Sequence, residues 1–131
     1  MVNEIIVDTS ALIEYAFGTE KGVVAKEIIE NHENIISTPS IVIGEFVSKT
    51  ERSGVKNIQE LIDNLIAYVT LIPLNWQICF KAGKRHAELR KLEKTISFVD
   101  CIVMEMAEEH GGALIITRDN HFKHYKNTKI I

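Results

Sequence analysis

Short apolar runs alternate with helical segments along this chain, and this alternation restricts the possible folds more than any other feature. Buried strands are predicted over 4–7, 34–37, 69–74 and 113–116, with a further short strand over 129–131. Helical periodicity and capping signals predict helices over 10–15, 20–30, 38–51, 57–68, 75–92 and 97–110. Strands that alternate with helices are joined by right-handed crossovers into a parallel sheet, which helices cover on both faces.

The chain is long enough for one core and has the composition of a globular protein. Its 131 residues fit a single domain over 1–131, since one domain takes roughly 100–200 residues. Hydrophobic residues make up 46%, yet no apolar run reaches the roughly 20 residues that cross a bilayer. Glu4 and Asp8 interrupt the first apolar stretch, unlike a secretory signal. We therefore expect a cytoplasmic protein with no membrane partner.

Local signals place several element boundaries. Thr38 is expected to cap the third helix, with Pro39 in its first turn, where a missing N–H is tolerated. Pro73 favours an edge position for the third strand, because proline cannot donate to a neighbouring strand. Residues 117–125 are expected to form a polar loop.

Four acidic residues are predicted to meet at one edge of this sheet. Asp8 and Asp119 follow the first and fourth strands, and parallel α/β sheets bind ligands at the carboxyl ends of their strands. Glu45 and Asp100 lie in helices whose amino-terminal ends are expected along the same edge. Carboxylates repel one another, and a hard cation such as Mg²⁺ is the usual reason to gather them. The pattern favours a metal-dependent phosphodiester hydrolase, in particular a small ribonuclease.

Each acid also has an ordinary structural interpretation. Asp8 precedes a helix that it could cap, and Asp119 lies in a loop where Asp commonly forms turns. Asp100 stands three residues after Ser97, which is the spacing of a capping box. Glu45 has largely apolar neighbours, which makes a solvent-facing role less natural. Their joint placement carries the functional prediction.

The net charge of −3 does not fit a general basic nucleic-acid binder, which usually has a pI above about 9. Setting aside the four candidate ligands from the 18 acids leaves 14, against 15 Lys and Arg. The remaining surface is then near +1. With cations in the site, the local field would favour phosphate.

Four motifs in order resemble those of a known family. They are VDTSAL at 7–12, Glu45 within 40–46, SFVD at 97–100, and TRDNHF at 117–122. Together they resemble the PIN domain, most closely the VapC-type toxin ribonucleases of type II toxin–antitoxin systems, over essentially the whole chain. The resemblance implies a three-layer α/β/α sandwich around a mostly parallel sheet of four to five strands.

The resemblance also implies a chemistry. The four acids would be catalytic ligands of one or two Mg²⁺ or Mn²⁺ ions, with Ser10 and Thr117 as supporting hydroxyls. The implied activity is that of an endoribonuclease that hydrolyses RNA phosphodiester bonds with metal-activated water. Arg118 is either a phosphate contact or an ordinary surface charge. His121 occupies a position where many relatives carry an acid, and its role as general base or as a contact to phosphate or solvent is open.

Partners follow from the same resemblance: an RNA substrate, a small antitoxin, and a second copy in a homodimer. The alternatives are an RNA-processing PIN nuclease outside such a pair, or a non-catalytic PIN-like module that binds RNA or protein. A phosphoacceptor receiver domain would need adjacent acids after the first strand, whereas Thr9 and Ser10 follow Asp8. A phosphatase of the DxD type is disfavoured because Ser10 takes the second acidic position.

Overall fold

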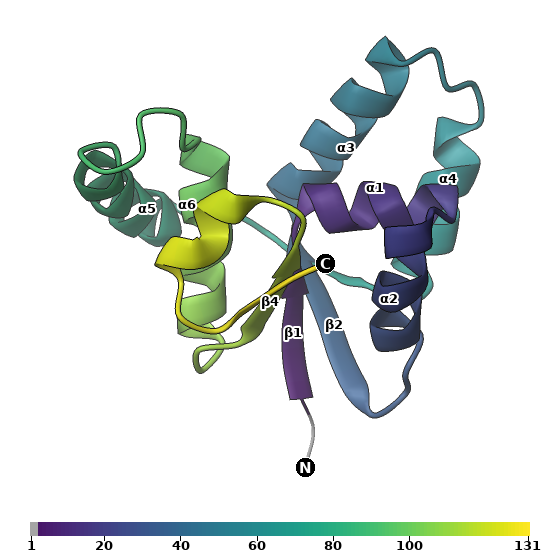
Figure 1. The fold of residues 1–131 in the computed structure, drawn as a ribbon, viewed down its shortest axis with the longest axis horizontal. Helices are drawn as coiled ribbons and strands as arrows, with labels where there is room; N and C mark the ends of the chain where they lie inside the picture. The colour runs from purple at the N-terminus through teal and green to yellow at the C-terminus, as the bar shows by residue number, and fades with distance from the viewer. Residues whose placement is uncertain (1–2) are drawn as a thin grey trace.

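A computed structural model describes residues 3–131, and its centre is a five-stranded sheet in which every neighbouring pair is parallel (Figure 1). The strand order is β3-β2-β1-β4-β5. The strands are β1 (Asn3–Val7), β2 (Asn34–Pro39), β3 (Thr70–Ile72), β4 (Leu114–Thr117) and β5 (Thr128–Ile130). The two outermost strands, β3 and β5, are three residues long. The predicted parallel sheet is confirmed.

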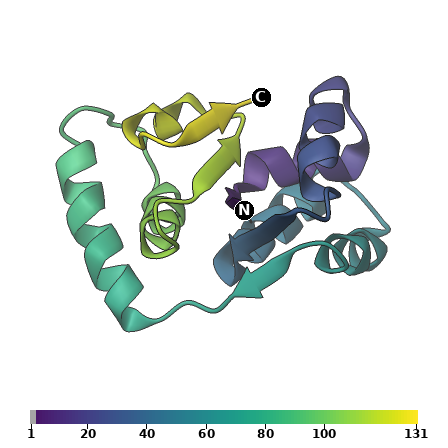
Figure 2. The ribbon, with the colours of Figure 1, turned by 90° about the horizontal axis from the view of Figure 1, so that it is seen from below.

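Helices cover both faces of the sheet and make the three layers that were predicted (Figures 1 and 2). One layer contains α1 to α4, and the opposite layer contains α5, α6 and the 3-10 helix η1. The helices are α1 (Thr9–Phe17), α2 (Glu20–Ile29), α3 (Ser40–Arg52), α4 (Ile58–Ile66), α5 (Trp76–Leu89), α6 (Phe98–Glu109) and η1 (Asn120–His124). The α/β/α fold class is therefore correct.

The central strands are apolar because both of their faces are covered. Ile6, Val7, Ile115 and Ile116 are at most 1% exposed, and continuous apolar runs are typical of strands that helices cover on both sides. β1 pairs with β2 on one side and with β4 on the other. The carboxyl ends of β1 and β4 thus lie next to each other.

The predicted start of the third helix was wrong. β2 continues through Pro39, which has an extended backbone, and α3 begins at Ser40. Thr38 does not cap the helix: its buried hydroxyl donates to the carbonyl oxygen of Val7 at 2.7 Å. The Thr38 side chain, which was expected to cap the helix, instead links β2 to β1.

Other boundaries differ less from expectation. β3 lies at a sheet edge, as predicted, but it ends at Ile72, before Pro73 and two residues earlier than expected. α5 ends at Leu89, three residues earlier than expected, and the predicted polar loop contains η1. Within residues 3–131, no helix combines the length and apolar character needed to cross a membrane.

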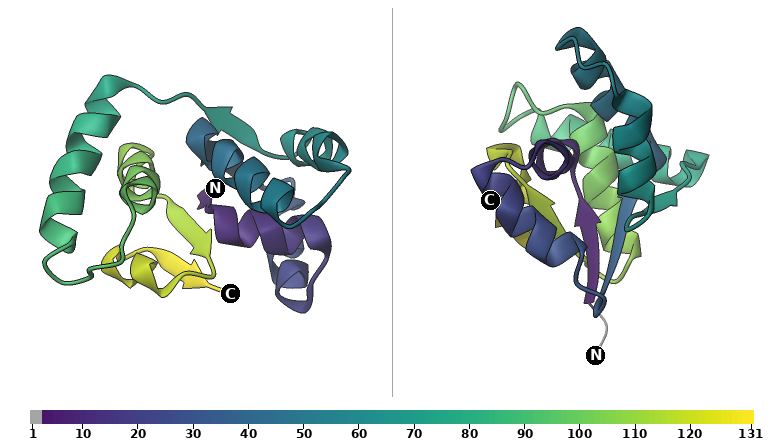
Figure 3. Two further views of the ribbon diagram at one scale, coloured as in Figure 1. Left: turned by 90° about the horizontal axis from the view of Figure 1, so that it is seen from above. Right: turned by 90° about the vertical axis from the view of Figure 1, so that its right-hand side faces the viewer.

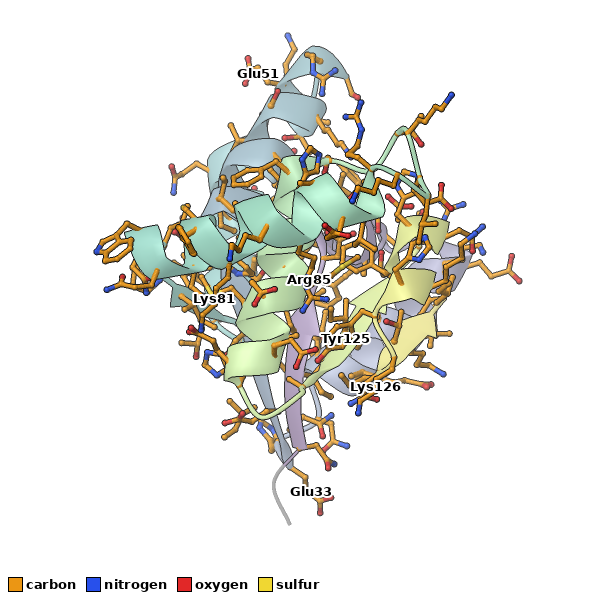
Figure 4. All side chains as sticks on the ribbon, turned by 90° about the vertical axis from the view of Figure 1, so that its left-hand side faces the viewer. Glu33, Glu51, Lys81, Arg85, Tyr125 and Lys126 are labelled. Carbon is orange, nitrogen blue, oxygen red and sulfur yellow. The ribbon has the colours of Figure 1, made fainter. Side chains whose placement is uncertain are left out.

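α5 packs on α6 rather than on the sheet, and an ion pair joins the two helices. Arg85 of α5 lies over α6, where its Nε donates to Glu105 at 2.6 Å and its guanidinium reaches Glu108 at 3.6 Å (Figure 4). The Arg85 and Glu105 side chains are 24% and 12% exposed, so this pair is shielded from solvent more than an ordinary surface pair. The ion pair thus holds α6, which carries Asp100, against α5.

Candidate active site

The sheet changes its direction of growth at β1. From β1 the chain builds β2 and β3 to one side and then crosses to place β4 and β5 on the other. Ligands of open parallel sheets bind at the carboxyl ends of the strands where the order reverses in this way. Figure 3, left, looks down on this edge, toward which β1 and β2 run before α1 and α3 begin.

All four predicted acids line one cavity of about 220 Å³ at this edge. They come from four parts of the chain: Asp8 ends β1, Glu45 lies on α3, Asp100 is in the first turn of α6, and Asp119 follows β4. The other lining residues are Thr9, Ser10, Lys49, Thr95, Ser97 and His121. The convergence expected from the sequence is present, and the functions of these residues remain predictions.

Asp8 is the most deeply buried of the acids, at 4% exposed. Its side chain makes no capping hydrogen bond to α1, so the capping interpretation fails. Instead its Oδ2 accepts from the hydroxyls of Ser10 at 3.0 Å and Thr117 at 2.9 Å. Burial raises the pKa of Asp8 to about 6, and the negative charge of Asp100 raises it further while the Thr117 hydroxyl opposes the shift.

Ser10 and Thr117 link the two sides of the site. Their hydroxyls lie 3.1 Å apart, and both contact Asp8. Ser10 Oγ also accepts from the backbone N–H of Arg118, and Thr117 Oγ1 accepts from the backbone N–H of Asp119, each at 2.9 Å. The two predicted supporting residues therefore position the loop after β4 against the start of α1.

Glu45 faces the cavity from α3 and is half-buried. Its Oε1 accepts from the hydroxyl of Thr9 at 2.7 Å. Thr9 is itself buried, at 2% exposed. This contact fixes one oxygen of Glu45 next to the end of β1, which accounts for a carboxylate among apolar neighbours.

Asp100 serves two purposes. The capping box predicted with Ser97 is present, since each residue's side chain accepts from the other's backbone N–H at 3.0–3.1 Å. The side chain is nevertheless 13% exposed and lines the cavity, with Oδ2 at 3.5 Å from Nδ1 of His121. Capping therefore orients this carboxylate and does not remove it from the site.

Asp119 and His121 form a turn that places both side chains in the cavity. Asp119 Oδ1 accepts from the backbone N–H of His121 at 2.8 Å, which confirms the turn-forming role of this Asp. Asp100, Asp119 and His121 offer ligand atoms that all lie within 4.8 Å of one another. His121 was not among the predicted ligands. The signal that could have indicated it is its spacing of two residues from Asp119 at a strand end.

Arg118 is more than a free surface charge. Its guanidinium pairs with Glu14 of α1, which is 8% exposed and also accepts from the hydroxyl of Thr19. The Thr19 hydrogen bond, followed by Arg118, lowers the pKa of Glu14 below its ordinary value. Arg118 and Lys49 line a second hollow of about 520 Å³ that shares Ser10, Asp119 and His121 with the site.

The donor set fits a divalent cation. Carboxylate oxygens are the ligands that Mg²⁺ and Mn²⁺ prefer, and one ion could reach Asp100, Asp119 and His121, whose ligand atoms lie within 4.8 Å of one another. Asp8 and Glu45 line the same cavity but do not belong to this closest group. The burial of Asp8 beside Asp100 gives a site where added positive charge is favourable. A larger hollow of about 730 Å³ lies at the opposite ends of the strands, and Glu4 is the one acid in its described lining.

The fold and the cavity together define an α/β/α protein with converging acids at the switch point of a parallel sheet. The chain belongs to the PIN domain family, whose sequence model matches residues 5–127. The resemblance predicted from the motifs is thus confirmed. A comparison with curated proteins gives no match.

Solved structures with the same fold include toxins of the VapC type. VapBC2 from Rickettsia felis, bound to a promoter DNA fragment, aligns over 100% of this chain and 98% of that chain, with 18% identity and a TM-score of 0.75. VapC20 from Mycobacterium tuberculosis, a toxin that cleaves the sarcin–ricin loop, aligns over 94% and 95% with 19% identity and a TM-score of 0.76. VapBC-1 from nontypeable Haemophilus influenzae aligns over 100% and 97%, with 20% identity and a TM-score of 0.68. These likenesses establish a shared fold.

Proposed function

We propose that this PIN domain is a metal-dependent endoribonuclease and the toxin of a toxin–antitoxin pair. The observation that carries the proposal is the convergence of Asp8, Glu45, Asp100 and Asp119 on one cavity at the switch point of the sheet. Gathering four carboxylates around the buried Asp8 is costly without positive charge, so their presence favours a cation-binding role over a purely structural one.

The four acids would hold Mg²⁺ or Mn²⁺. Such an ion supplies charge stabilisation for a scissile phosphate and acidifies its bound water. Asp8 is oriented for this role because the Ser10 and Thr117 hydroxyls both donate to its Oδ2. Glu45 is held by Thr9, and Asp100 by the amino terminus of α6, so neither needs to reorganise on binding.

RNA is the proposed substrate. Lys49 and Arg118 line the hollow that adjoins the acids, where cationic side chains would contact phosphates on either side of the cleaved bond. VapC20, which shares the fold, is a toxin that cleaves the sarcin–ricin loop. Because water rather than the RNA 2′-OH would be the nucleophile, cleavage is expected to leave a 5′-phosphate and a 3′-hydroxyl.

An antitoxin is the proposed partner, with a homodimer as the proposed assembly. A toxin–antitoxin complex from Klebsiella pneumoniae is among the solved structures that share the fold. A small antitoxin-like reading frame beside this one, whose product co-purifies with the chain and inhibits it, is expected. If no such product exists and cleavage is limited to one precursor RNA, the alternative of a processing nuclease is correct.

The test is cleavage of structured and single-stranded RNA by the purified protein in Mg²⁺, Mn²⁺ or EDTA. Asp8→Asn should abolish cleavage, as should EDTA. Asp63→Asn is the matched control, since it makes the same change at an exposed acid of α4 whose partner is Gln59. Cleavage that survives both chelation and Asp8→Asn would overturn the enzyme assignment. A protein that binds RNA without any cleavage would support the non-catalytic alternative.

A further inference from the structure

We propose that His121 is a ligand of the metal ion through Nδ1, so that the site combines oxygen donors with one nitrogen donor. This inference rests on the proposed function, since it concerns the same cation. It adds a residue to the four acids and gives the site a preference among divalent ions. It follows from where the imidazole points, what its two nitrogens contact, and what holds the ring.

The ring nitrogen Nδ1 faces two carboxylates. It lies 3.5 Å from Oδ2 of Asp100 and 3.4 Å from Oδ1 of Asp119. Adjacent ligands of an octahedral ion with bonds of about 2.1 Å are roughly 3 Å apart, so these separations need to change by only a few tenths of an ångström. Ligand atoms of the three residues lie within 4.8 Å of one another, so a single ion could bind between them.

Among the described residues, Nδ1 of His121 is a buried polar atom with no hydrogen-bond partner. Its distances to the two carboxylate oxygens exceed the 2.7–3.2 Å typical of N–H···O hydrogen bonds. A buried polar atom without a partner is unfavourable, and native proteins rarely leave one unexplained. A cation between the imidazole and the carboxylates would satisfy all three groups.

The second ring nitrogen has the partner that a metal-binding histidine usually has. Nε2 of His121 lies 2.9 Å from the hydroxyl oxygen of Thr95. When Nε2 donates its proton to this oxygen, Nδ1 presents its lone pair to the cavity. Histidine ligands commonly donate their other N–H in this way, which fixes both the tautomer and the ring orientation.

The backbone also holds His121 in place. Its N–H donates to Asp119 Oδ1, and the next residue, Phe122, is fully buried. The imidazole and the Asp119 carboxylate are therefore parts of one anchored turn. A preformed pair of this kind lowers the ordering cost of binding an ion.

A nitrogen donor changes which ion is preferred. Mg²⁺ strongly favours oxygen ligands, whereas imidazole readily binds first-row transition ions. The wild-type site should therefore favour Mn²⁺ over Mg²⁺ more than a site with oxygen donors alone. His121→Asp supplies such an oxygen and should move the ratio of the two dissociation constants toward Mg²⁺.

The experiment uses Mn²⁺ as the probe, because its electron spin detects a directly bound nitrogen. Pulsed electron paramagnetic resonance of the Mn²⁺-loaded protein should show ¹⁴N coupling that His121→Ala and His121→Asp abolish. His124→Ala is the matched control: His124 lies on the same 3-10 helix, but its Nε2 faces Glu93 at 3.4 Å, and the coupling should persist. Circular dichroism establishes that each variant is folded.

Titration calorimetry supplies the second readout. Loss of an outer-shell partner alone typically costs about 10- to 100-fold in metal affinity, so His121→Ala should weaken Mn²⁺ binding at least about tenfold. Mn²⁺ binding of unchanged affinity, with no ¹⁴N coupling in the wild type, would overturn the role of His121 and leave the carboxylate site standing. Absence of any Mn²⁺ binding would instead overturn the proposed function itself.

Discussion

At the scale of single residues, Asp8 shows how a candidate metal ligand differs from an ordinary surface carboxylate. Two hydroxyls orient it, the ends of β1 and β4 bury it, and Asp100 adds a second negative charge nearby. Burial and the charge of Asp100 make the ionised form costly without a cation, and the two hydroxyls offset only part of this cost. The same arrangement that weakens the metal-free fold therefore strengthens the attraction for a cation.

This cost predicts how stability depends on pH without metal. The pKa of Asp8 rises from 3.8 to about 6 on folding, so between these values the folded state binds more protons than the unfolded state. Raising the pH through this window should destabilise the wild type by up to roughly 3 kcal/mol relative to Asp8→Asn, at about 1.4 kcal/mol per tenfold change in proton affinity. Urea melts of both proteins in EDTA between pH 4 and about 7 measure this difference. Parallel stability curves would contradict it.

Thr117 offers a second prediction at this scale. It is fully buried, donates to Asp8 and accepts from the N–H of Asp119, so Thr117→Val removes one of the two hydroxyl donors to Asp8 and leaves the Asp119 N–H without this acceptor. We expect a loss of about 1–3 kcal/mol of stability and of most RNA cleavage. Thr117→Ser should retain both. Thr50→Val, at a buried threonine whose hydroxyl donates to Phe46, should lower stability and leave cleavage intact.

At the scale of elements, three of the four acids lie where an element begins or ends: at the end of β1, in the first turn of α6 and in the turn after β4. The fourth, Glu45, lies in the second turn of α3. α3 also carries Lys49, one turn after Glu45, and both side chains line the acidic cavity. Lys49 reaches the adjoining hollow as well. One helix thus presents a proposed metal ligand and a cation next to it.

Lys49→Ala should weaken RNA binding without weakening Mn²⁺ binding. If Lys49 contacts a phosphate, the slope of the logarithm of RNA affinity against the logarithm of salt concentration should fall in magnitude by about 1. Fluorescence anisotropy with labelled RNA at several salt concentrations measures this slope. Lys56→Ala, at an exposed lysine between α3 and α4, is the control. Equal slopes for the two variants would exclude the contact.

Some positions in the site could be predicted from the sequence, whereas others depend on tertiary contacts. Asp8 and Asp119 could be placed because strand ends are visible as the ends of apolar runs, and parallel topology brings them together. Thr38 misled because its capping signal is local, while its hydroxyl donates to Val7 on the neighbouring strand. Arg118 pairs with Glu14, which is 104 positions away, and no periodic pattern in the sequence indicates this contact. His121 was noted in the sequence with its role open, because its approach to Asp100 depends on the tertiary fold.

At the scale of the whole molecule, the proposed cation would join segments that the sheet alone holds at a distance. The four acids come from both helical layers and from two strand ends, so binding should stabilise the entire fold. At about 100 times its dissociation constant, a ligand that binds the folded state alone adds roughly 2.7 kcal/mol. A thermal melt should thus shift upward with Mn²⁺ in the wild type and much less in Asp8→Asn. An equal shift in both proteins would indicate that the ion binds elsewhere.

The brevity of the sheet's outer strands has a consequence for how the protein behaves at high concentration. An edge strand recruits other chains through its unpaired backbone groups, and a long, flat edge is a template for aggregation. β3 and β5 are each three residues long, and Pro73, which directly follows β3, has no backbone N–H that could continue the pairing along that edge. Stacking of molecules through either edge strand would therefore gain few intermolecular hydrogen bonds. Any self-association would then be expected to use side chains on the helices.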